Sequence, residues 1–338
     1  MEHEDLTVRR GRRSGLPVII AVHSRALGPA VGGVRLRRYS SWRDGVDDAL
    51  RLSEAMTAKC AAAGLAFGGG KSVIALDEDT PLTPSLRQAA LDDLGELIAA
   101  HDGSYLAGPD VGTGPADMLV LRQHSPHVFC LPEENGGTGT SSIPTAVGVL
   151  AALRAGVRHV FGADSVARLT VVISGLGSVG SLIAQGLPGA RVVVSDVDSS
   201  RRDPAYEWVS PAEALRTPAD IFVPAAVGGV FSPETVANVQ ARLVVGPANN
   251  QLTAYLVAGL LAERGVTWIP DFVASAGGVI YTLGREVEHL THEEAMARVE
   301  GIGSTVDSLL GSARTPLDAA MDLVRERLTR PRADLASR

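Results

Sequence analysis

The chain has 338 residues, of which 45% are hydrophobic and 20% charged, a composition typical of a globular protein that is long enough for two domains. Its net charge of −7 and its pI of about 5.6 disfavour binding to nucleic acid, whose phosphate backbone attracts basic proteins. No apolar run reaches the roughly 20 residues of a membrane span, and the first residues lack a signal-peptide core, so we expect a cytoplasmic protein without a membrane segment. The two cysteines lack the spacing of a zinc site or a disulfide framework, so we expect no bound metal.

Short β-branched runs alternate with longer helical patterns along the chain. Strands are expected over residues 18–22, 72–76, 169–173, 192–194 and 243–245. Helices are expected over residues 44–63, 84–101, 143–156, 178–187 and 253–264. This alternation predicts an α/β fold with mainly parallel sheets. The glycine-rich segment 134–142 is typical of a surface loop or of a hinge, and we interpret it as a domain boundary because a dinucleotide-binding pattern follows it.

The segment from Ser41 to Gly64 is predicted to be an amphipathic helix. Ser41 and Asp44 have the spacing of a capping box, and Gly64 is a natural residue just past a helix end. The apolar stripe consists of Ala49, Leu52, Met56, Cys60 and Ala63, and the opposite face of Asp47, Asp48, Arg51 and Glu54. Lys59 falls on the apolar side, so either its amine reaches solvent from the edge of the stripe or it points into a cleft and binds an anionic ligand.

A second lysine, Lys71, follows three consecutive glycines and opens a predicted strand. The segment is not a P-loop, because that motif requires a glycine in place of Leu65 and a helix after the lysine. A lysine shielded from water here would have a lowered pKa and act as a base near neutral pH; the alternative is a flexible turn with an exposed lysine. Asp110, at the end of a short extended segment, is either a ligand-binding residue or an ordinary turn aspartate.

A dinucleotide-binding pattern begins at residue 169. A strand leads through a glycine-rich turn into a helix, and the turn consists of Gly175, Leu176, Gly177, Ser178, Val179 and Gly180. A second strand ends at Asp196, 21 residues after Gly175, where a carboxylate accepts hydrogen bonds from the adenosine ribose and repels the 2′-phosphate of NADP. NAD is therefore the expected cofactor, although Arg201 and Arg202 are near enough in sequence to bind a phosphate.

Seven segments resemble the leucine, phenylalanine and valine dehydrogenases of the wider glutamate dehydrogenase superfamily. They are LGPAVGGVRLRRYS (27–40), EAMTAKCAAAGLAFGGGKSVI (54–74), GPDVGTGPADM (108–118), TAVGV (145–149), GLGSVG (175–180), GPANNQL (246–252) and PDFVASAGGVI (270–280). They follow the family's order from residue 27 to residue 280, and residues 284–287 are similar to a phenylalanine dehydrogenase segment.

The resemblance implies a two-domain α/β protein. Residues 1–138 would form a substrate-binding and catalytic domain, residues 139–285 a Rossmann-type NAD-binding domain, and residues 286–338 helices that pack back toward the first domain. The implied reaction is the reversible, NAD-dependent oxidative deamination of a hydrophobic L-amino acid to a 2-oxo acid and ammonium, catalysed by a homo-oligomer. The alternative is a family member with weakened catalysis that binds NAD as a sensor or subunit.

The resemblance also implies a role for each matching residue. Lys71 would activate the water that attacks the imino acid, Asp110 would handle the proton of the amino group, and Lys59 would bind the α-carboxylate. Gly33 and Asn249 would lie near the substrate, with Asn249 also near the nicotinamide ribose. The other implied cofactor contacts are Arg35, Thr145, the turn residues 175–180, Asp196, Val197, Ala225 and Ala226.

Four further positions would determine which side chain is accepted. Glutamate dehydrogenases have a lysine at the position of Val31, so glutamate is disfavoured and an apolar substrate is expected. Gly108 replaces an alanine of the aliphatic-specific relatives, which we interpret as leaving more room, as in the phenylalanine enzymes. Thr282 carries a hydroxyl where relatives have valine or leucine, and Val279 completes the set.

Overall fold

The computed structural model describes residues 3–329, which divide into two compact units. Within these residues, unit 1 comprises 3–140, 282–290 and 323–329, and unit 2 comprises 141–281 and 291–322. The sequence predicts one C-terminal segment, 286–338, associated with the first domain; instead, its residues 291–322 belong to unit 2. Residues 1, 2 and 330–338 of the predicted domains lie outside the described part of the chain.

Unit 1 is built on a five-stranded sheet in the order β1-β2-β4-β3-β5. The strands are β1 (Asp5–Arg10), β2 (Pro17–Ser24), β3 (Ala30–Tyr39), β4 (Gly68–Asp77) and β5 (Tyr105–Pro109). β3 is parallel to β4 and to β5, whereas β2 is antiparallel to both β1 and β4. β2 is the strand of this sheet that runs against the other four, because its short connection to β1 forms a hairpin, and a hairpin requires antiparallel strands. The other four strands share one direction, as the expected mainly parallel sheet requires.

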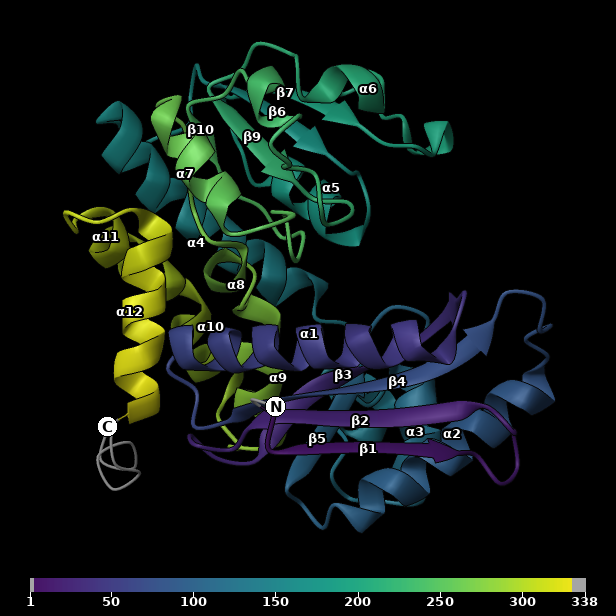
Figure 1. Ribbon diagram of the computed structural model, residues 1–338. Coiled ribbons are helices and arrows are strands. Elements are labelled where there is room, and N and C mark those ends of the chain that lie inside the picture. Colours follow the sequence, from purple (N-terminus) through teal and green to yellow (C-terminus); the bar gives the residue numbers. More distant parts are fainter. Residues whose placement is uncertain (1–2, 330–338) are drawn as a thin grey trace. The chain divides into compact units, whose positions relative to one another are not determined.

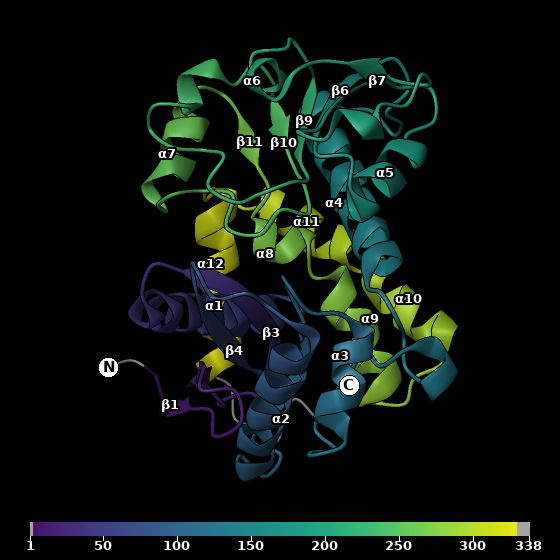
Figure 2. The same cartoon turned by 90° about the vertical axis from the view of Figure 1, so that its right-hand side faces the viewer.

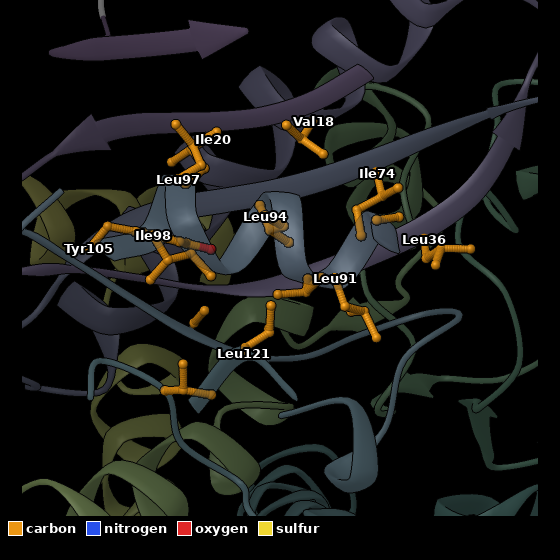
Figure 3. Close-up of a cluster of buried hydrophobic side chains, with 14 of the residues drawn as sticks. Val18, Ile20, Leu36, Ile74, Leu91, Leu94, Leu97, Ile98, Tyr105 and Leu121 are labelled. Atoms are coloured by element: carbon orange, nitrogen blue, oxygen red, sulfur yellow. The ribbon is translucent and has the colours of Figure 1, made fainter. Parts of the chain in front are cut away.

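Helices cover both faces of this sheet (Figure 1). The helix α1 (Trp42–Ala62) lies on one face, where it packs chiefly on β4 and β2. On the other face lie α2 (Pro84–Ala100) and α3 (Pro115–Arg122). Figure 3 shows the larger core of the unit, in which Leu91, Leu94 and Leu97 of α2 pack against Ile20 and Ile74 of the sheet. Each such buried side chain contributes roughly 1.5–3 kcal/mol of hydrophobic free energy.

Unit 2 has a six-stranded sheet in which every described pair is parallel, in the order β11-β10-β9-β6-β7-β8. Its strands are β6 (Thr170–Ser174), β7 (Arg191–Ser195), β8 (Glu207–Trp208), β9 (Ile221–Pro224), β10 (Leu243–Val244) and β11 (Thr267–Trp268). The chain order reverses at β6, and nucleotides bind at the carboxyl end of strands at such a switch point. Figure 2 shows this sheet with its surrounding helices.

The helices of unit 2 connect and cover these strands. They are α4 (Ser142–Phe161), α5 (Ser178–Gln185), α6 (Pro211–Ala214), α7 (Leu256–Glu263), α8 (Asp271–Ala274), α10 (His292–Glu300) and α11 (Ile302–Leu310). Two further helices, α9 (Gly277–Glu286) and α12 (Pro316–Thr329), run from residues of unit 2 into residues of unit 1. All the strands and helices expected from the sequence are present, with ends that differ by a few residues.

Candidate active site

Lys71 lies inside β4, which begins three residues earlier at Gly68. The three glycines are therefore part of the strand, and the alternative of a flexible turn with an exposed lysine is wrong, because Lys71 is only 5% exposed. A Cβ at Gly69 would overlap the backbone of Thr57 in α1, and a Cβ at Gly70 would lie 2.7 Å from the ring of Tyr105. Glycine at these positions lets the helix and the aromatic ring pack directly on the strand that carries Lys71.

The strand register places Lys71 beside two further glycines. Side chains alternate between the faces of a sheet, and Lys71 shares the face of Val73 and Ala75, which pack against Ala49 of α1. In β3, Val34 pairs with Ser72, so Gly33 lies next to Lys71, and Gly33 in turn pairs with Gly108 of β5. One side chain and two bare glycines thus form a row across β4, β3 and β5.

The carboxylate of Asp110 joins two basic side chains. Lys71 Nζ donates to Asp110 Oδ2 at 2.6 Å, and Arg35 Nε donates to the same oxygen at 2.9 Å. The backbone N–H of Asp110 donates to Thr113 Oγ1 at 3.0 Å, which fixes the turn that follows β5. Asp110 is therefore not an ordinary turn aspartate, because its carboxylate neutralises a nearly buried lysine.

A second carboxylate, Asp48 of α1, extends this network. Its Oδ2 accepts from Arg35 Nη1 and from the hydroxyl of Tyr39, both at 2.8 Å, while Oδ1 accepts from Arg51 Nη2 at 2.6 Å. The sequence prediction that Asp48 lies on the solvent-facing side of the helix is wrong, since it is 9% exposed. Its position four residues before Leu52 was a signal, because residues at this spacing share a helix face.

These contacts determine the charges at the site. Burial lowers the pKa of Lys71, and the charge and hydrogen bond of Asp110 oppose this effect. Burial raises the pKa of Asp110, but the charges of Lys71 and Arg35 outweigh it and bring that pKa to about 2. Asp110 is therefore a carboxylate at neutral pH, and Lys71 gives up its proton more easily than an exposed lysine does.

Lys59 lies in the last turn of α1, where it is partly buried. Its charge acts on the neighbouring thiol of Cys60, whose pKa burial raises to about 12 against that charge. The capping box of Ser41 and Asp44 is confirmed at the other end of the helix, and Gly64 follows its C-terminus with a left-handed φ of 70°. The role of Lys59 as the carboxylate-binding residue stays a prediction.

The space beside Gly108 is filled by an aromatic ring. A Cβ at Gly108 would lie 2.5 Å from both Cε2 and Cζ of Phe129. The interpretation that this glycine leaves more room is therefore wrong, and the sequence pattern contained no signal for Phe129.

Two other predicted specificity residues also lie in unit 1. Val31 is fully buried in β3. The hydroxyl of Thr282 is hydrogen-bonded to the thiol of Cys130, whose pKa burial raises to about 12.

In unit 2, the glycine-rich turn connects β6 to α5, which confirms the predicted strand, turn and helix. Gly175 has a φ of 114°, and a Cβ there would lie 2.7 Å from the backbone between Ala225 and Ala226. Gly177 is the N-cap of α5, and its side-chain position is open except for Arg201 Nη1 at 3.4 Å. The turn therefore brings backbone N–H groups to a helix N-terminus, the arrangement that binds phosphate.

Asp196 directly follows β7 and lies against this turn. Its Oδ2 accepts from the N–H of Leu176 at 2.8 Å, and its Oδ1 accepts from the N–H of Asp198 at 2.9 Å. Burial raises the pKa of Asp196, but these two N–H groups and Arg201 outweigh it, so the pKa is lowered and the side chain is charged at neutral pH. Arg201 pairs with both aspartates, at 3.3 and 3.4 Å.

The remaining predicted residues of unit 2 lie around the same sheet. Arg202 stacks on Trp208, with its guanidinium carbon 5.8 Å from the ring centre. Thr145, in the first turn of α4, donates its hydroxyl proton to the carbonyl of Ser141 at 2.7 Å. Val197 is 90% exposed after β7, Asn249 lies in the loop between β10 and α7, and Val279 lies in α9.

The chain matches known families over two segments and known proteins over nearly its whole length. Residues 4–127 match the family described as Glu/Leu/Phe/Val dehydrogenase, dimerisation domain, and residues 195–289 match Glutamate/Leucine/Phenylalanine/Valine dehydrogenase. The chain is 35% identical to phenylalanine dehydrogenase of Caldalkalibacillus thermarum, over 97% of this chain and 91% of that protein. It is 36% identical to valine dehydrogenase of Streptomyces albus, over 98% of this chain and 93% of that protein.

A solved structure has the same architecture. L-tryptophan dehydrogenase from Nostoc punctiforme is similar with a TM-score of 0.80 and 30% identity, over 97% of this chain and 96% of that one. The family matches, the curated relatives and this structure therefore agree. The chain belongs to the glutamate/leucine/phenylalanine/valine dehydrogenase family of amino-acid dehydrogenases.

Proposed function

We propose that the protein catalyses the reversible, NAD-dependent oxidative deamination of a hydrophobic L-amino acid to its 2-oxo acid and ammonium. The observation that carries this proposal is the nearly buried Lys71, whose amine lies 2.6 Å from Asp110. A buried lysine with a lowered pKa is suited to act as a general base near neutral pH. The family supplies the class of reaction, and this pair supplies the groups that move the protons.

In the proposed mechanism, Lys59 binds the α-carboxylate and so orients the α-carbon. NAD, when bound, supplies the hydride acceptor. Asp110, which is ionised, first accepts a proton from the ammonium group of the substrate, so that loss of the α-hydrogen as hydride leaves an iminium. Lys71 then takes a proton from water, the resulting hydroxide adds to the iminium carbon, and Asp110 returns its proton to the nitrogen. The C–N bond breaks, ammonia leaves with the proton of the new hydroxyl as ammonium, and the carbonyl of the 2-oxo acid forms.

Arg35 is better explained as a positioning residue than as the cofactor contact that the sequence predicts. Both its Nε and its Nη1 donate to carboxylates of unit 1, Asp110 and Asp48, and its side chain is 13% exposed. A planar guanidinium with two fixed partners holds Asp110 in place. We propose that this bridge keeps the Asp110 carboxylate directed at Lys71.

The residues of unit 2 suit a bound dinucleotide. The backbone approach at Gly175 and the N-terminus of α5 would bind the pyrophosphate. Asp196 is charged, and its Oδ1, which accepts from the N–H of Asp198, can accept a second hydrogen bond from a ribose hydroxyl, while Oδ2 already accepts from Leu176 and Arg201. Because Thr145 already donates its proton to Ser141, its hydroxyl oxygen remains to accept from the amide of the nicotinamide.

The proposed preference for NAD predicts the effect of Asp196→Ser. This change removes the charge that repels a 2′-phosphate and releases Arg201 to bind one. The ratio of kcat/KM for NAD to that for NADP is expected to fall tenfold or more, since hydrogen bonds to charged groups contribute about 1.5–3 kcal/mol. Asp198→Ser is the matched control, because Asp198 pairs with the same arginine but is not at the strand end. An unchanged ratio in Asp196→Ser would refute this assignment of the cofactor preference.

A second prediction concerns Gly33, the glycine of β3 that lies next to Lys71. A Cβ at Gly33 would lie 2.7 Å from Asp110 Cβ and 3.1 Å from Lys71 Nζ, so Gly33→Ala must displace Asp110 and disturb its contact with Lys71. We expect kcat to fall by about tenfold or more, the effect of a general base that loses its alignment. Gly259→Ala is the control, because a Cβ there meets nothing within 4 Å and glycine disfavours the helix that contains it. Equal kcat values for both variants would contradict the close packing of this site.

The protein is proposed to act as a homo-oligomer. Residues 4–127 match a family whose description includes dimerisation, and light scattering of the purified protein tests whether copies associate. Between residues 3 and 329, no helix has the length and apolar character that crossing a membrane requires. The cytoplasmic location remains a prediction from the sequence.

A panel of hydrophobic L-amino acids with NAD tests the proposed activity. Formation of NADH, followed by its absorbance, is expected with at least one branched or aromatic substrate. NADH that binds tightly while no member of the panel is oxidised would overturn the proposal in favour of a sensor or a non-catalytic subunit.

A further inference from the structure

The ring of Phe129 stands beside Lys71 on the same face of the sheet. Lys71 Nζ lies 3.1 Å from the position of a Gly33 Cβ, and the Phe129 ring lies 2.5 Å from the position of a Gly108 Cβ. Gly33 and Gly108 are paired residues of β3 and β5. The amine therefore lies over β3 and the ring over β5, on neighbouring strands that are about 4.8 Å apart.

The backbone around Phe129 determines the direction of this ring. Phe129 N–H donates to the carbonyl of Ala107 at 3.0 Å, and Ala107 N–H donates to the carbonyl of His127 at 3.0 Å, so residues 127–129 extend the sheet beside β5. Val128 belongs to the core under α2. Because side chains alternate between faces, Phe129 points to the opposite face, on which Lys71 lies.

The segment after Phe129 is firmly held. Cys130 has a left-handed φ of 59°, and its N–H donates to Glu286 Oε1 at 3.0 Å. The same oxygen accepts from the N–H and the hydroxyl of Thr138, at 2.8 and 2.5 Å. Thr282 is hydrogen-bonded to the thiol of Cys130. The ring is therefore fixed on both sides, by the edge of β5 before it and by Glu286 after it.

We propose that Phe129 limits the size of the substrate's side chain, so that aliphatic amino acids of the size of valine and leucine are preferred over aromatic ones. This inference rests on the proposed function. A substrate that reacts at Lys71 lies over the glycine row, and the ring occupies the space that Gly108 leaves open. An aromatic side chain would have to displace a ring that is 7% exposed and whose backbone is anchored.

The test compares kcat/KM for L-valine and L-phenylalanine in the wild type and in Phe129→Leu and Phe129→Ala. The wild type is expected to favour valine by tenfold or more. Both variants are expected to shift the ratio toward phenylalanine, Phe129→Ala by tenfold or more, mainly through a lower KM for phenylalanine. One methylene of pocket space changes the discrimination between two substrates by roughly 10–200-fold. If Phe129→Ala does not fold, Phe129→Leu still provides the test.

Phe231→Leu is the matched control, because Phe231 is a fully buried phenylalanine of unit 2. It should lower stability without changing the ratio of the two substrates. A wild type that favours phenylalanine, or a ratio unchanged in both Phe129 variants, would overturn the inference while leaving the proposed reaction intact. Absence of turnover with any amino acid and either NAD or NADP would instead refute the proposed function.

Discussion

Replacing Lys71 by methionine is expected to lower kcat by about 10³-fold, within the range of the loss of a general base. Methionine has a similar length and suits the buried position, whose lysine is 5% exposed. The dissociation constant for NAD should stay within about twofold of the wild-type value, because the residues proposed to bind the nucleotide belong to unit 2. Steady-state kinetics and titration of NADH fluorescence measure the two quantities. A variant with wild-type kcat would refute the assignment of Lys71 as the base.

The pKa of Lys71 can be measured directly, because the 31 lysine and arginine residues of the chain include only two lysines. Protein labelled with ¹³C at lysine Cε should show two resonances, and Lys71→Met assigns them. The Lys71 resonance is expected to titrate at lower pH than that of an ordinary lysine, since burial lowers its pKa. Two resonances that both titrate like exposed lysines would contradict this account of the base.

Replacing Asp110 by asparagine is expected to lower kcat by about 10²–10³-fold and to destabilise the protein by about 3 kcal/mol at neutral pH. The change leaves the ammonium of Lys71 without its partner at 2.6 Å, and breaking a buried ion pair costs roughly 3–5 kcal/mol. Denaturant unfolding at several pH values measures the stability loss. Asp307→Asn is the control, because its pair with Arg158 is exposed and is worth about 0–1 kcal/mol.

The pH dependence of this loss has a definite sign. Without Asp110, which raises the pKa of Lys71, that pKa falls further below its unfolded value. The folded state then binds fewer protons than the unfolded state between those two pKa values, so stability rises with pH in this window. The deficit of Asp110→Asn should therefore shrink as the pH rises. A double variant, Lys71→Met with Asp110→Asn, should recover stability but not activity, and a deficit independent of pH would contradict the ion-pair explanation.

The scarcity of lysine supports a role for Lys71 that arginine could not fill. Lys59 and Lys71 apart, the 31 lysine and arginine residues of the sequence are all arginine, which stays protonated in proteins. A position that must release its proton requires lysine, and this condition holds for Lys71 in the proposed mechanism. Arg35, whose task is to hold Asp110 and Asp48, needs only a permanent charge and a planar fork.

Local patterns in the sequence predicted the elements that carry the site. The capping box at Ser41, the glycine turn at Gly175 and the acidic residue at Asp196 each depend on a few neighbouring residues, and each is present. The roles of Lys71 and Asp110 followed from the family resemblance, while the contact between them joins β4 to the turn after β5. Such a pairing depends on strand order, which spacing along the chain does not specify.

The predictions from the sequence that are wrong share one cause. The triple glycine has the composition of a turn, but Thr57 and Tyr105 approach the backbone there, and only the folded sheet brings them together. Gly108 has the composition of an enlarged site, but the ring of Phe129, 21 residues further along, fills the space beside it. Asp48 is buried because Arg35 on another element neutralises it. Each case depends on a neighbour that is distant in sequence.

The most direct test of the central claim is the amount of ammonium released for each NADH formed by the wild-type protein with its best hydrophobic L-amino acid. Oxidative deamination through water activated by Lys71 predicts equal amounts of the two products, together with the matching 2-oxo acid. NADH formed without ammonium would contradict the account, because hydride transfer would then not be followed by attack of water on an iminium.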